Sequence, residues 1–322
     1  EPSEAPSTAA TEEPVTAPEA PLRTIVDARD AGARLDAWLA RTFDCSRARA
    51  RELMEAGHVR VDDRPVDASA KGRKLLAGQA VAVALDPAAL DRIEPAPRLP
   101  VEILAEGDGW IVVDKPAGVP VHPLRADETD TLLQRLAARR PSIVGIGEGG
   151  LRSGVVHRLD VDTSGCQAFA TEPRSFETLR AAFREHRVDK VYRAIVGGRP
   201  PDDGVVDLDL VVARHRPARV RAFAAGEGPV GSRRCRTRWR RLEQLDGRHA
   251  LVEARPHTGF LHQIRVTLAH LGHPLVGDAV YGDGTGASRH MLHASALRVG
   301  PIDAASPDPE DFRACLKRYR GD

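Results

Sequence analysis

The sequence predicts a protein of mixed helices and strands with more than one domain. Its 322 residues are enough for two domains, and a hydrophobic content of 42% can support a core. From residue 101 onward, apolar residues at strand spacing and at helix spacing alternate, and a Pro-rich stretch without a clear period precedes them. We therefore expect four parts, namely a disordered acidic tail (1–21), a small domain (22–86), a linker (87–100) and the main domain (101–322).

Composition excludes several classes of protein. Residues 1–21 consist mainly of Pro, Ala, Glu and Thr, so they cannot bury enough apolar surface to become ordered. No stretch of 18 apolar residues is present, which argues against a membrane span, and no signal-peptide pattern follows Glu1. The cysteines are far apart and lack C-x-x-C spacing, which favours the reducing cytoplasm; they are Cys45, Cys166, Cys235 and Cys315.

Basic residues dominate once the acidic tail is set aside. The first 21 residues hold five acids and no base, which leaves 47 basic and 41 acidic residues elsewhere, a net charge of +6. Residues 213–241 alone contain ten Arg and one acid, Glu227. Such a density suits a polyanionic partner bound with salt-sensitive affinity. The alternative is a partly mobile basic loop beside a hairpin.

Two short helices and a hairpin are expected in the small domain. RLDAWLARTF has four apolar residues at helical spacing, and a second helix follows the candidate N-cap Ser46 and ends at Gly57. HVRVDDRPV and AVAVAL alternate like strands. The second helix carries Arg47, Arg49 and Arg51. On local pattern alone this is a solvated basic face.

Three runs in this domain nevertheless resemble the S4-like RNA-binding domain, a small α/β helix-helix-hairpin module. They are RLDAWLA, SRARARELMEAGHVRVDDRPV and KGRKLLAGQAVAV. The sequence differs from the usual pattern by DDR in the hairpin and by Gly78-Gln79 where Gly-Asp is common. The resemblance assigns the basic helix, with Arg47, Arg49 and Arg51, to RNA.

Strand and helix patterns follow one another through the main domain. VEILAEGDGWIVVDKPAGVPVHP predicts two strands joined by a Gly-Asp-Gly turn and followed by a Pro-Gly loop. TDTLLQRLAARRP and SFETLRAAF predict helices, the first of them capped, and DKVYRAIVGG predicts a strand. TRWRRLEQLDGRHALVEARP predicts a hairpin that turns at Asp246-Gly247. FLHQIRVTLAHLGHP predicts a helix that stops at Gly272.

The run HRLDVDTSG, residues 157–165, contains the main candidate for chemistry. Asp162 is most simply a cap of the Thr163-Ser164-Gly165 turn. Asp160 differs because apolar residues surround it, a pattern that suggests a strand leading into a pocket. A carboxylate in such a place must be paired or accept several hydrogen bonds. A paired, ionised Asp in an apolar pocket is also what nucleophilic catalysis requires.

Arg265 is the candidate partner of Asp160. It lies beside the apolar stripe of the helix expected in HTGFLHQIRVTLAHL, and a guanidinium there needs an anion. The alternative is that Arg265 extends to solvent. Tyr192 lies in the middle of a predicted strand, where the local pattern favours an ordinary core aromatic residue.

Motifs for metals and phosphates are missing. The histidines near residue 262 lack H-E-x-x-H spacing and have no nearby Cys, so no metal is expected. The loop DKPAGVPVHP contains Lys115 and a glycine, but it lacks the Gly-rich pattern of a phosphate loop.

Taken in order, six runs of the main domain resemble the RluA/RluD type of pseudouridine synthase. These runs are DKPAGVPVHP, GVVHRLDVDTSG, KVYRAIVGG, HTGFLHQIR, GHPLVGDAVYG and MLHASAL, and they span residues 114–297. The resemblance implies an α+β fold, that of the pseudouridine synthases, with a mixed, largely antiparallel sheet. It also implies isomerisation of uridine within RNA, without cofactor or metal.

The resemblance also implies roles for single residues. Asp160 matches the catalytic aspartate that attacks the target uridine, so that the base detaches, turns and rejoins through carbon 5. Arg265 matches the basic residue that pairs with this aspartate. Tyr192 matches a tyrosine that acts as base at carbon 5 or stacks on the uracil. This role replaces the interpretation of Tyr192 as an ordinary core aromatic residue. The nucleotide-binding positions are Arg158, which fills the gap left by the extruded base, His157 and Leu292. Arg233, Arg234 and Arg236 are expected to contact the RNA backbone.

One departure and several alternatives remain. The family commonly has T-G-R-x-H-Q-I-R, whereas Phe260 takes the place of the first arginine here. Ribosomal RNA of the large subunit is the expected substrate and transfer RNA the second choice. A non-catalytic RNA-binding or ribosome-assembly factor would be expected to have lost Asp160, Tyr192 or Arg265. A glycosidase would need a second carboxyl group, and none is evident. We expect a cytoplasmic monomer.

Overall fold

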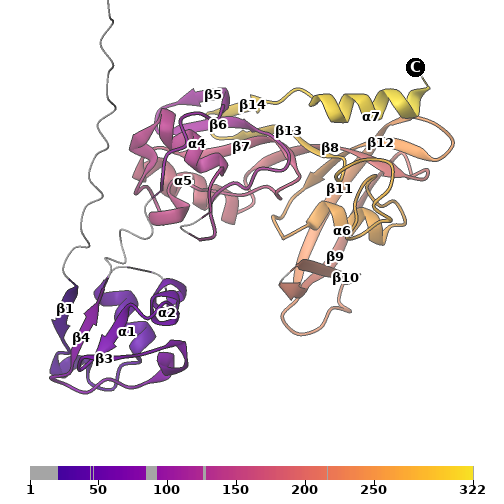
Figure 1. Cartoon of the computed structure of the whole chain (residues 1–322). Helices are drawn as coiled ribbons and strands as arrows, with labels where there is room; N and C mark the ends of the chain where they lie inside the picture. The colour runs from indigo at the N-terminus through magenta and orange to yellow at the C-terminus, as the bar shows by residue number, and fades with distance from the viewer. Residues whose placement is uncertain are drawn as a thin grey trace, which may run out of the picture. The chain divides into compact units, whose positions relative to one another are not determined.

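The computed structural model describes residues 21–43, 45, 47–84, 93–125, 128–215 and 217–321 (Figure 1). The chain divides into two compact units between Arg92 and Ile93, inside the segment expected as a linker. The expected acidic tail, apart from Pro21, and the candidate N-cap Ser46 lie outside the described residues. Each unit is considered by itself.

The first unit contains the expected two helices and hairpin. Its four-stranded antiparallel sheet has the order β1-β4-β2-β3, and α1 and α2 pack against it through a core that includes Trp38, Leu39 and Met54. The β2–β3 turn has positive φ at both Asp62 and Asp63, as a tight two-residue hairpin turn requires. The elements are β1 (Leu22–Ile25), η1 (Ala28–Asp30), α1 (Leu35–Thr42), α2 (Arg47–Glu55), β2 (Val59–Val61), β3 (Arg64–Pro65), η2 (Ala68–Gly72) and β4 (Ala80–Val83).

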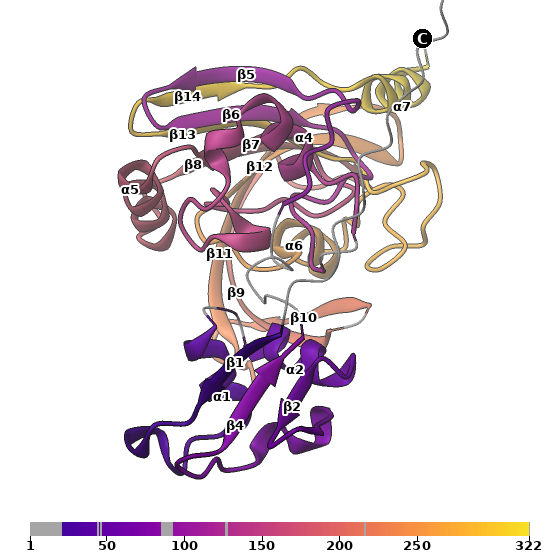
Figure 2. The same ribbon diagram turned by 60° about the vertical axis from the view of Figure 1, so that its left-hand side comes forward.

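The second unit is built on one ten-stranded sheet, which is mixed and largely antiparallel as expected. Its order is β10-β9-β11-β12-β8-β13-β7-β6-β5, with β14 paired to β13, and Figure 2 shows β14 beside β13 and β5. Every pair of adjacent strands is antiparallel except β13 with β7. The strands are β5 (Glu102–Gly107), β6 (Trp110–Lys115), β7 (Ser164–Ala170), β8 (Asp189–Gly197), β9 (Asp203–His215), β10 (Ala218–Ala224), β11 (Arg233–Gln244), β12 (His249–Pro256), β13 (Leu292–Val299) and β14 (Ile302–Ala305).

Helices cover both faces of this sheet. They are α4 (Leu132–Arg139), α5 (Pro173–Arg184), α6 (Gln263–His270) and α7 (Glu310–Arg320), with short 3₁₀ turns η3 (Pro141–Ile143) and η4 (Gly150–Arg152). Alternate residues of β6 face opposite sides, so Ile111 and Val113 pack with α4 whereas Val112 packs with α5. A capping box between Thr131 and Gln134 starts α4.

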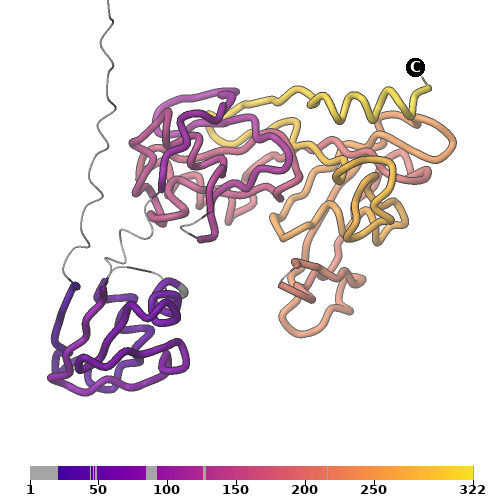
Figure 3. The backbone as a smooth tube through the Cα atoms, in the orientation of Figure 1, coloured from indigo at the N-terminus to yellow at the C-terminus, as the bar shows by residue number. Residues whose placement is uncertain are grey.

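The other half of the sheet repeats this arrangement with α6 and α7. Ala194 and Val196 of β8 pack with α6, whereas Ile195 packs with Phe312 of α7. Figure 3 shows α7, in yellow, running beside the orange strands. Tyr192 contacts the apolar clusters of both α4 and α6, so these two helices share one face of the sheet.

The helix predicted from Phe260 begins three residues later than expected, at Gln263. The Gln263 Oε1 accepts hydrogen bonds from the Thr258 hydroxyl at 2.8 Å and from the Phe260 N–H at 3.0 Å, and these bonds favour an irregular turn before the helix. His262, at the N-cap, has a left-handed backbone with φ of 55°. In the described part of the chain, no helix combines the length and the apolar character that crossing a membrane requires.

Gly165 lies at the start of β7, where β7 runs parallel to β13. Its φ is +108°, and an added Cβ would lie 2.2 Å from the Ala294 carbonyl oxygen. We predict that Gly165→Ala lowers the free energy of unfolding by at least about 2 kcal/mol, because both strain and backbone overlap result. Urea unfolding followed by circular dichroism measures this change.

Gly247→Ala is the matched control. Gly247 has no positive φ, and the nearest atom to an added Cβ is the Arg199 Nη2 at 3.9 Å. Equal losses for the two variants would contradict the close approach of β7 to β13.

Candidate active site

Asp160 lies on an irregular loop that leads into β7. The prediction of a strand at this point was wrong, because β7 begins only at Ser164. The turn also differs from the expected one. It spans Asp160 to Thr163, whose N–H donates to the Asp160 carbonyl at 3.1 Å, and Ser164 and Gly165 already belong to the strand. Asp162 therefore does not cap a Thr-Ser-Gly turn.

Buried side chains replace the ladder hydrogen bonds of a strand. Lys115 is fully buried and donates to the carbonyl oxygens of Pro116, Val119 and Val161 at 2.9, 2.6 and 2.6 Å. Burial lowers the pKa of this ammonium group to about 7, whereas the nearby charges of Asp162 and Asp160 act to raise it. Lys115 thereby fixes the peptide between Val161 and Asp162, one residue beyond Asp160.

The peptides before Asp160 are fixed by Gln167. Its Oε1 accepts from the Leu159 N–H at 3.2 Å, and its Nε2 donates to the His157 carbonyl at 2.8 Å. The His157 ring accepts from the Ala168 N–H at 2.9 Å and stacks on Phe183 with centroids 4.5 Å apart. Burial lowers the pKa of His157 to about 3, so the ring is neutral and can accept this bond.

The residues after Asp160 in the loop are bound by side chains of the segment before β13. Arg289 donates to the Asp162 carbonyl at 3.0 Å and pairs with Asp311 at 2.6 Å. His290 Nε2 lies 2.9 Å from the Thr163 hydroxyl oxygen. Polar contacts on every side therefore define the position of the Asp160 backbone.

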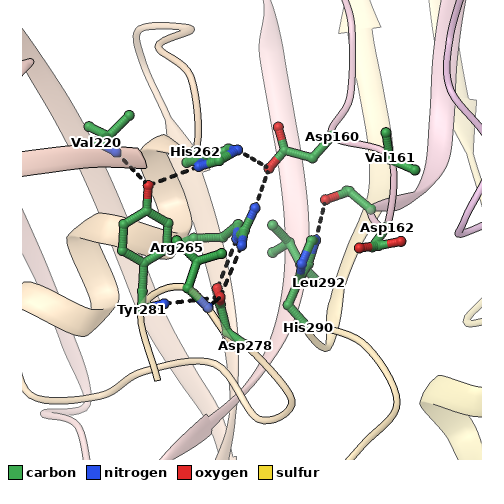
Figure 4. A network of polar contacts seen from close by, with 12 residues as sticks. Asp160, Val161, Asp162, Val220, His262, Arg265, Asp278, Tyr281, His290 and Leu292 are labelled. Carbon is green, nitrogen blue, oxygen red and sulfur yellow. Dashed lines mark hydrogen bonds and ion pairs between the residues drawn. The ribbon is translucent and has the colours of Figure 1, made fainter. Parts of the chain in front are cut away.

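Arg265 reaches the Asp160 side chain from α6 (Figure 4). Its Nη1 lies 3.2 Å from Asp160 Oδ2, which is the contact that the sequence predicted. Its other two nitrogens donate to Asp278, from Nε to Oδ2 at 2.8 Å and from Nη2 to Oδ1 at 2.9 Å. Arg265 is thus buried between two carboxylates.

Asp278 has no exposed side-chain surface and also accepts from the N–H groups of Val280 and Tyr281. Burial alone would raise the pKa of Asp278, but the Arg265 guanidinium and these N–H groups hold it below its usual value. Burial likewise opposes the charge of Arg265, whose pKa the two carboxylates raise. The Arg265–Asp278 pair is therefore ionised and fixed before any ligand binds.

Tyr192 and Leu292 lie beside Asp160 in the same cleft. Tyr192 is on β8, opposite Ala294 of β13, and Leu292 begins β13 and is 3% exposed. Burial, together with the nearby charge of Asp160, raises the pKa of the Tyr192 phenol. The phenol is therefore neutral at ordinary pH.

A cleft of about 730 Å³ contains Asp160, Tyr192, Arg265 and Leu292 in its wall. This volume is in the range of ligand pockets. The cleft also includes Arg158, His157 and Phe260. Further cations line it, and they are Arg152, Arg180, Arg184, Lys190, Arg233 and Arg234. These cations outnumber the acidic lining residues, which are Glu148 and Asp160, so the cleft suits a polyanion.

The predicted backbone-binding arginines separate into several environments. Arg233 and Arg234 line the cleft, and Arg234 also pairs with Asp209 at 2.6 Å, whereas Arg236 lies outside the cleft and pairs with Asp207 at 2.8 Å. On α2 of the first unit, Arg47 is exposed. Arg49 pairs with Glu52 at 2.7 Å, and Arg51 pairs with Asp36 at 3.0 Å.

Sequence reasoning assigned no role to three residues of the site. Asp278 and Tyr281 lie in GHPLVGDAVYG and His262 lies in HTGFLHQIR, so their presence in matched runs was the available signal. His262 was weighed only as a metal ligand. Among the residues that the structure describes, no three His, Cys, Asp or Glu side chains gather as they would around a metal ion.

Comparisons with known proteins agree on one family. The sequence profile described as RNA pseudouridylate synthase matches residues 109–270, and that of the S4 domain matches residues 33–71. An "Uncharacterized RNA pseudouridine synthase" of Chloroflexus aurantiacus is 36% identical over 88% of this chain and 86% of its own length. A "Ribosomal large subunit pseudouridine synthase D" of Xanthomonas campestris is 32% identical over 93% of each chain.

Solved structures give the same fold. The human protein "RNA Pseudouridylate Synthase Domain Containing 1" superposes with a TM-score of 0.55 and 27% identity, over 69% of this chain and 90% of its own.

The Arg265–Asp278 pair is expected to stabilise the folded protein. We predict that Asp278→Asn lowers the free energy of unfolding by about 3 kcal/mol near neutral pH, because a buried guanidinium loses its partner. Since the folded pKa of Asp278 lies below its usual 3.8, the stabilisation is present above pH about 4 and is lost as the pH falls through the folded value.

Urea unfolding of the wild type and the variant between pH 3 and 7 measures this difference. Asp303→Asn is the control, because its side chain is 76% exposed and its pairing with Arg298 should contribute less than about 1 kcal/mol. A difference between wild type and Asp278→Asn that stays constant with pH would contradict the ion pair.

Proposed function

Because this chain belongs to the RNA pseudouridine synthase family, we propose that it isomerises uridine to pseudouridine in ribosomal RNA with Asp160 as the nucleophile. The observation that carries this proposal is the Asp160 carboxylate, which is paired through Oδ2 with Arg265 inside a cationic cleft. Within the described part of the chain, Oδ1 forms no hydrogen bond or ion pair. This oxygen is therefore free to attack.

The proposed reaction needs no outside reactant. Asp160 Oδ1 forms a bond to the target nucleotide, the glycosidic bond to nitrogen 1 breaks, and the uracil turns so that carbon 5 bonds to the ribose. The carbon 5 proton leaves, nitrogen 1 gains a proton, and the Asp160 bond is released. Atoms and electrons balance because the product is an isomer of the substrate.

Tyr192 supports this scheme by contact with the base. The resemblance allowed either a base at carbon 5 or a stacking partner. A phenol whose pKa is raised by burial and by Asp160 gives up its proton reluctantly, which favours stacking. Leu292 supplies apolar surface beside it, and Arg158, which is exposed at the cleft, suits the gap left by the extruded nucleotide.

His157 is the weakest of the proposed nucleotide contacts. Its Nε2 already accepts from the Ala168 N–H, and one face of the ring is covered by Phe183. We propose that it shapes the wall of the cleft, in which it lies.

Ribosomal RNA is preferred because several relatives at 32–36% identity carry the name ribosomal large subunit pseudouridine synthase D. The S4-like domain is consistent with this choice. Transfer RNA is the second candidate. The cytoplasmic location and the monomeric state stay predictions that accompany this substrate. A glycosidase is disfavoured, because Asp278 is fully buried and held by Arg265, and Glu148, the acidic residue other than Asp160 in the cleft wall, pairs with Arg152 and Arg180.

Tritium release from RNA labelled at carbon 5 of uridine tests the activity. Ribosomal and transfer RNA that lack the modification are assayed separately. We predict release from ribosomal RNA by the wild type, and a loss of at least about a thousandfold for Asp160→Asn because the nucleophile is removed. Asp162→Asn, an exposed neighbour, is the control and should keep most activity.

Release from transfer RNA alone would move the substrate to the second candidate. Absence of release from both, with binding retained, would favour the non-catalytic RNA-binding factor.

Arg47 tests the contribution of the first unit to RNA binding. It is exposed on α2, whereas its neighbours Arg49 and Arg51 pair with acids. We predict that Arg47→Gln weakens RNA binding by about three- to tenfold and reduces the slope of log K against log salt by about 0.7–0.9. Filter binding at several salt concentrations measures both.

Arg29→Gln, at a side chain that is 83% exposed, removes the same charge and should leave affinity and slope nearly unchanged. If both variants lowered affinity alike, the S4-like unit would contribute only general charge.

A further inference from the structure

The residues His262 and Tyr281 form a chain of contacts that leads from the edge of the sheet to Asp160 (Figure 4). It starts at a bulge between β9 and β10. Arg219 pairs with Arg214, but the next residue, Val220, pairs with Val212, so Ala213 has no opposite residue. At this bulge the Val220 N–H donates to the Tyr281 hydroxyl oxygen at 2.8 Å.

The Tyr281 hydroxyl then determines the tautomer of His262. Tyr281 Oη accepts from Val220, and it lies 2.8 Å from His262 Nδ1. If Nδ1 carried the proton, the phenol proton would have no acceptor among the contacts of the described residues. The phenol therefore donates to Nδ1, and the proton of the neutral ring is on Nε2. Burial lowers the pKa of His262, which favours this neutral form.

The protonated Nε2 faces the proposed nucleophile. It lies 3.9 Å from Asp160 Oδ2, the same oxygen that Arg265 approaches at 3.2 Å. At 3.9 Å this is no hydrogen bond, but contacts in an unliganded site often shorten when the substrate binds. Two donors on Oδ2 would leave Oδ1 as the oxygen directed at the substrate.

We propose that His262 is a positioning residue that orients the Asp160 carboxylate through its Nε2–H, with Tyr281 and the Val220 bulge fixing the ring. The proposal rests on the proposed function and adds the side chain that, together with Arg265, holds Oδ2 so that Oδ1 is left to attack. The left-handed backbone of His262, with φ of 55°, belongs to the same arrangement because it sets the direction of the ring just before α6.

Two substitutions at His262 separate the effect of its Nε2–H donor on the rate from the effect of its left-handed backbone on folding. Glutamine places an amide N–H near the position of Nε2, whereas asparagine places its amide near Nδ1 and can accept from Tyr281 but cannot reach Asp160. Asparagine tolerates the left-handed backbone better than glutamine does. If His262 positions Asp160, the glutamine variant should react faster than the asparagine variant. If His262 matters only for folding, the asparagine variant should be the faster of the two.

The rate of a single turnover at saturating RNA is the readout, with RNA affinity and thermal stability measured beside it. We expect His262→Asn to lower the rate by about ten- to a hundredfold, in line with the loss of a hydrogen bond to a charged group, and His262→Gln to lower it by less than about threefold. Affinity should stay the same, and His262→Asn should be at least as stable as His262→Gln. The controls His270→Asn and His270→Gln, at the exposed end of α6, should match the wild type.

Tyr281→Phe provides a second test if either His262 variant fails to fold. It removes one hydroxyl group, so the ring of His262 can turn, and the rate should fall by about tenfold with unchanged affinity. Tyr319→Phe on α7 is its control.

Equal rates for the two His262 variants, a faster His262→Asn, or a Tyr281→Phe variant with the wild-type rate would overturn the positioning role. Failure of the proposed function looks different, because the wild type itself would then convert no uridine.

Discussion

A guanidinium that is only 6% exposed must be paired on every side, and Arg265 meets this requirement with two carboxylates. Asp278 takes two of its nitrogens and fixes its plane, so the third is directed at Asp160. The remaining features follow from this constraint. The loop of Asp160 is tied down by Lys115 and Gln167, and α6 is placed by its apolar contacts with β8 and β12. Neither element alone would bring the two charges together.

The sequence was sufficient for the fold class, most elements and the central pair. Alternation and helical spacing identified β8, α4 and the β11–β12 hairpin because their apolar faces repeat regularly. Asp160 and Arg265 could be connected because a charge among apolar neighbours demands a partner. The loop before β7 was predicted wrongly since its backbone is satisfied by distant side chains, a feature that local pattern does not contain. Asp278 and His262 were missed because their side-chain contacts with Arg265 and Tyr281 are likewise not contained in local pattern.

The charge count along the sequence overestimated how many arginines are available to bind RNA. The ten arginines of residues 213–241 suggested an unpaired basic segment, but β9 supplies acids opposite several of them. Arg234 pairs with Asp209, and Arg236 pairs with Asp207, each across one rung of the β9–β11 ladder. The charge that remains available to RNA is therefore smaller than the sequence suggests. It is concentrated where cations line the cleft.

The bulge at Ala213 bears on how this protein tolerates insertions and deletions over evolution. Beyond Arg214 and Arg219, the tip of the β9–β10 hairpin can gain or lose residues without altering the register at Val220. Loss of a single residue at Ala213 would instead remove the bulge at which the Val220 N–H donates to Tyr281. Natural length variation should therefore accumulate at the tip and avoid the bulge, even though both lie on the same exposed hairpin.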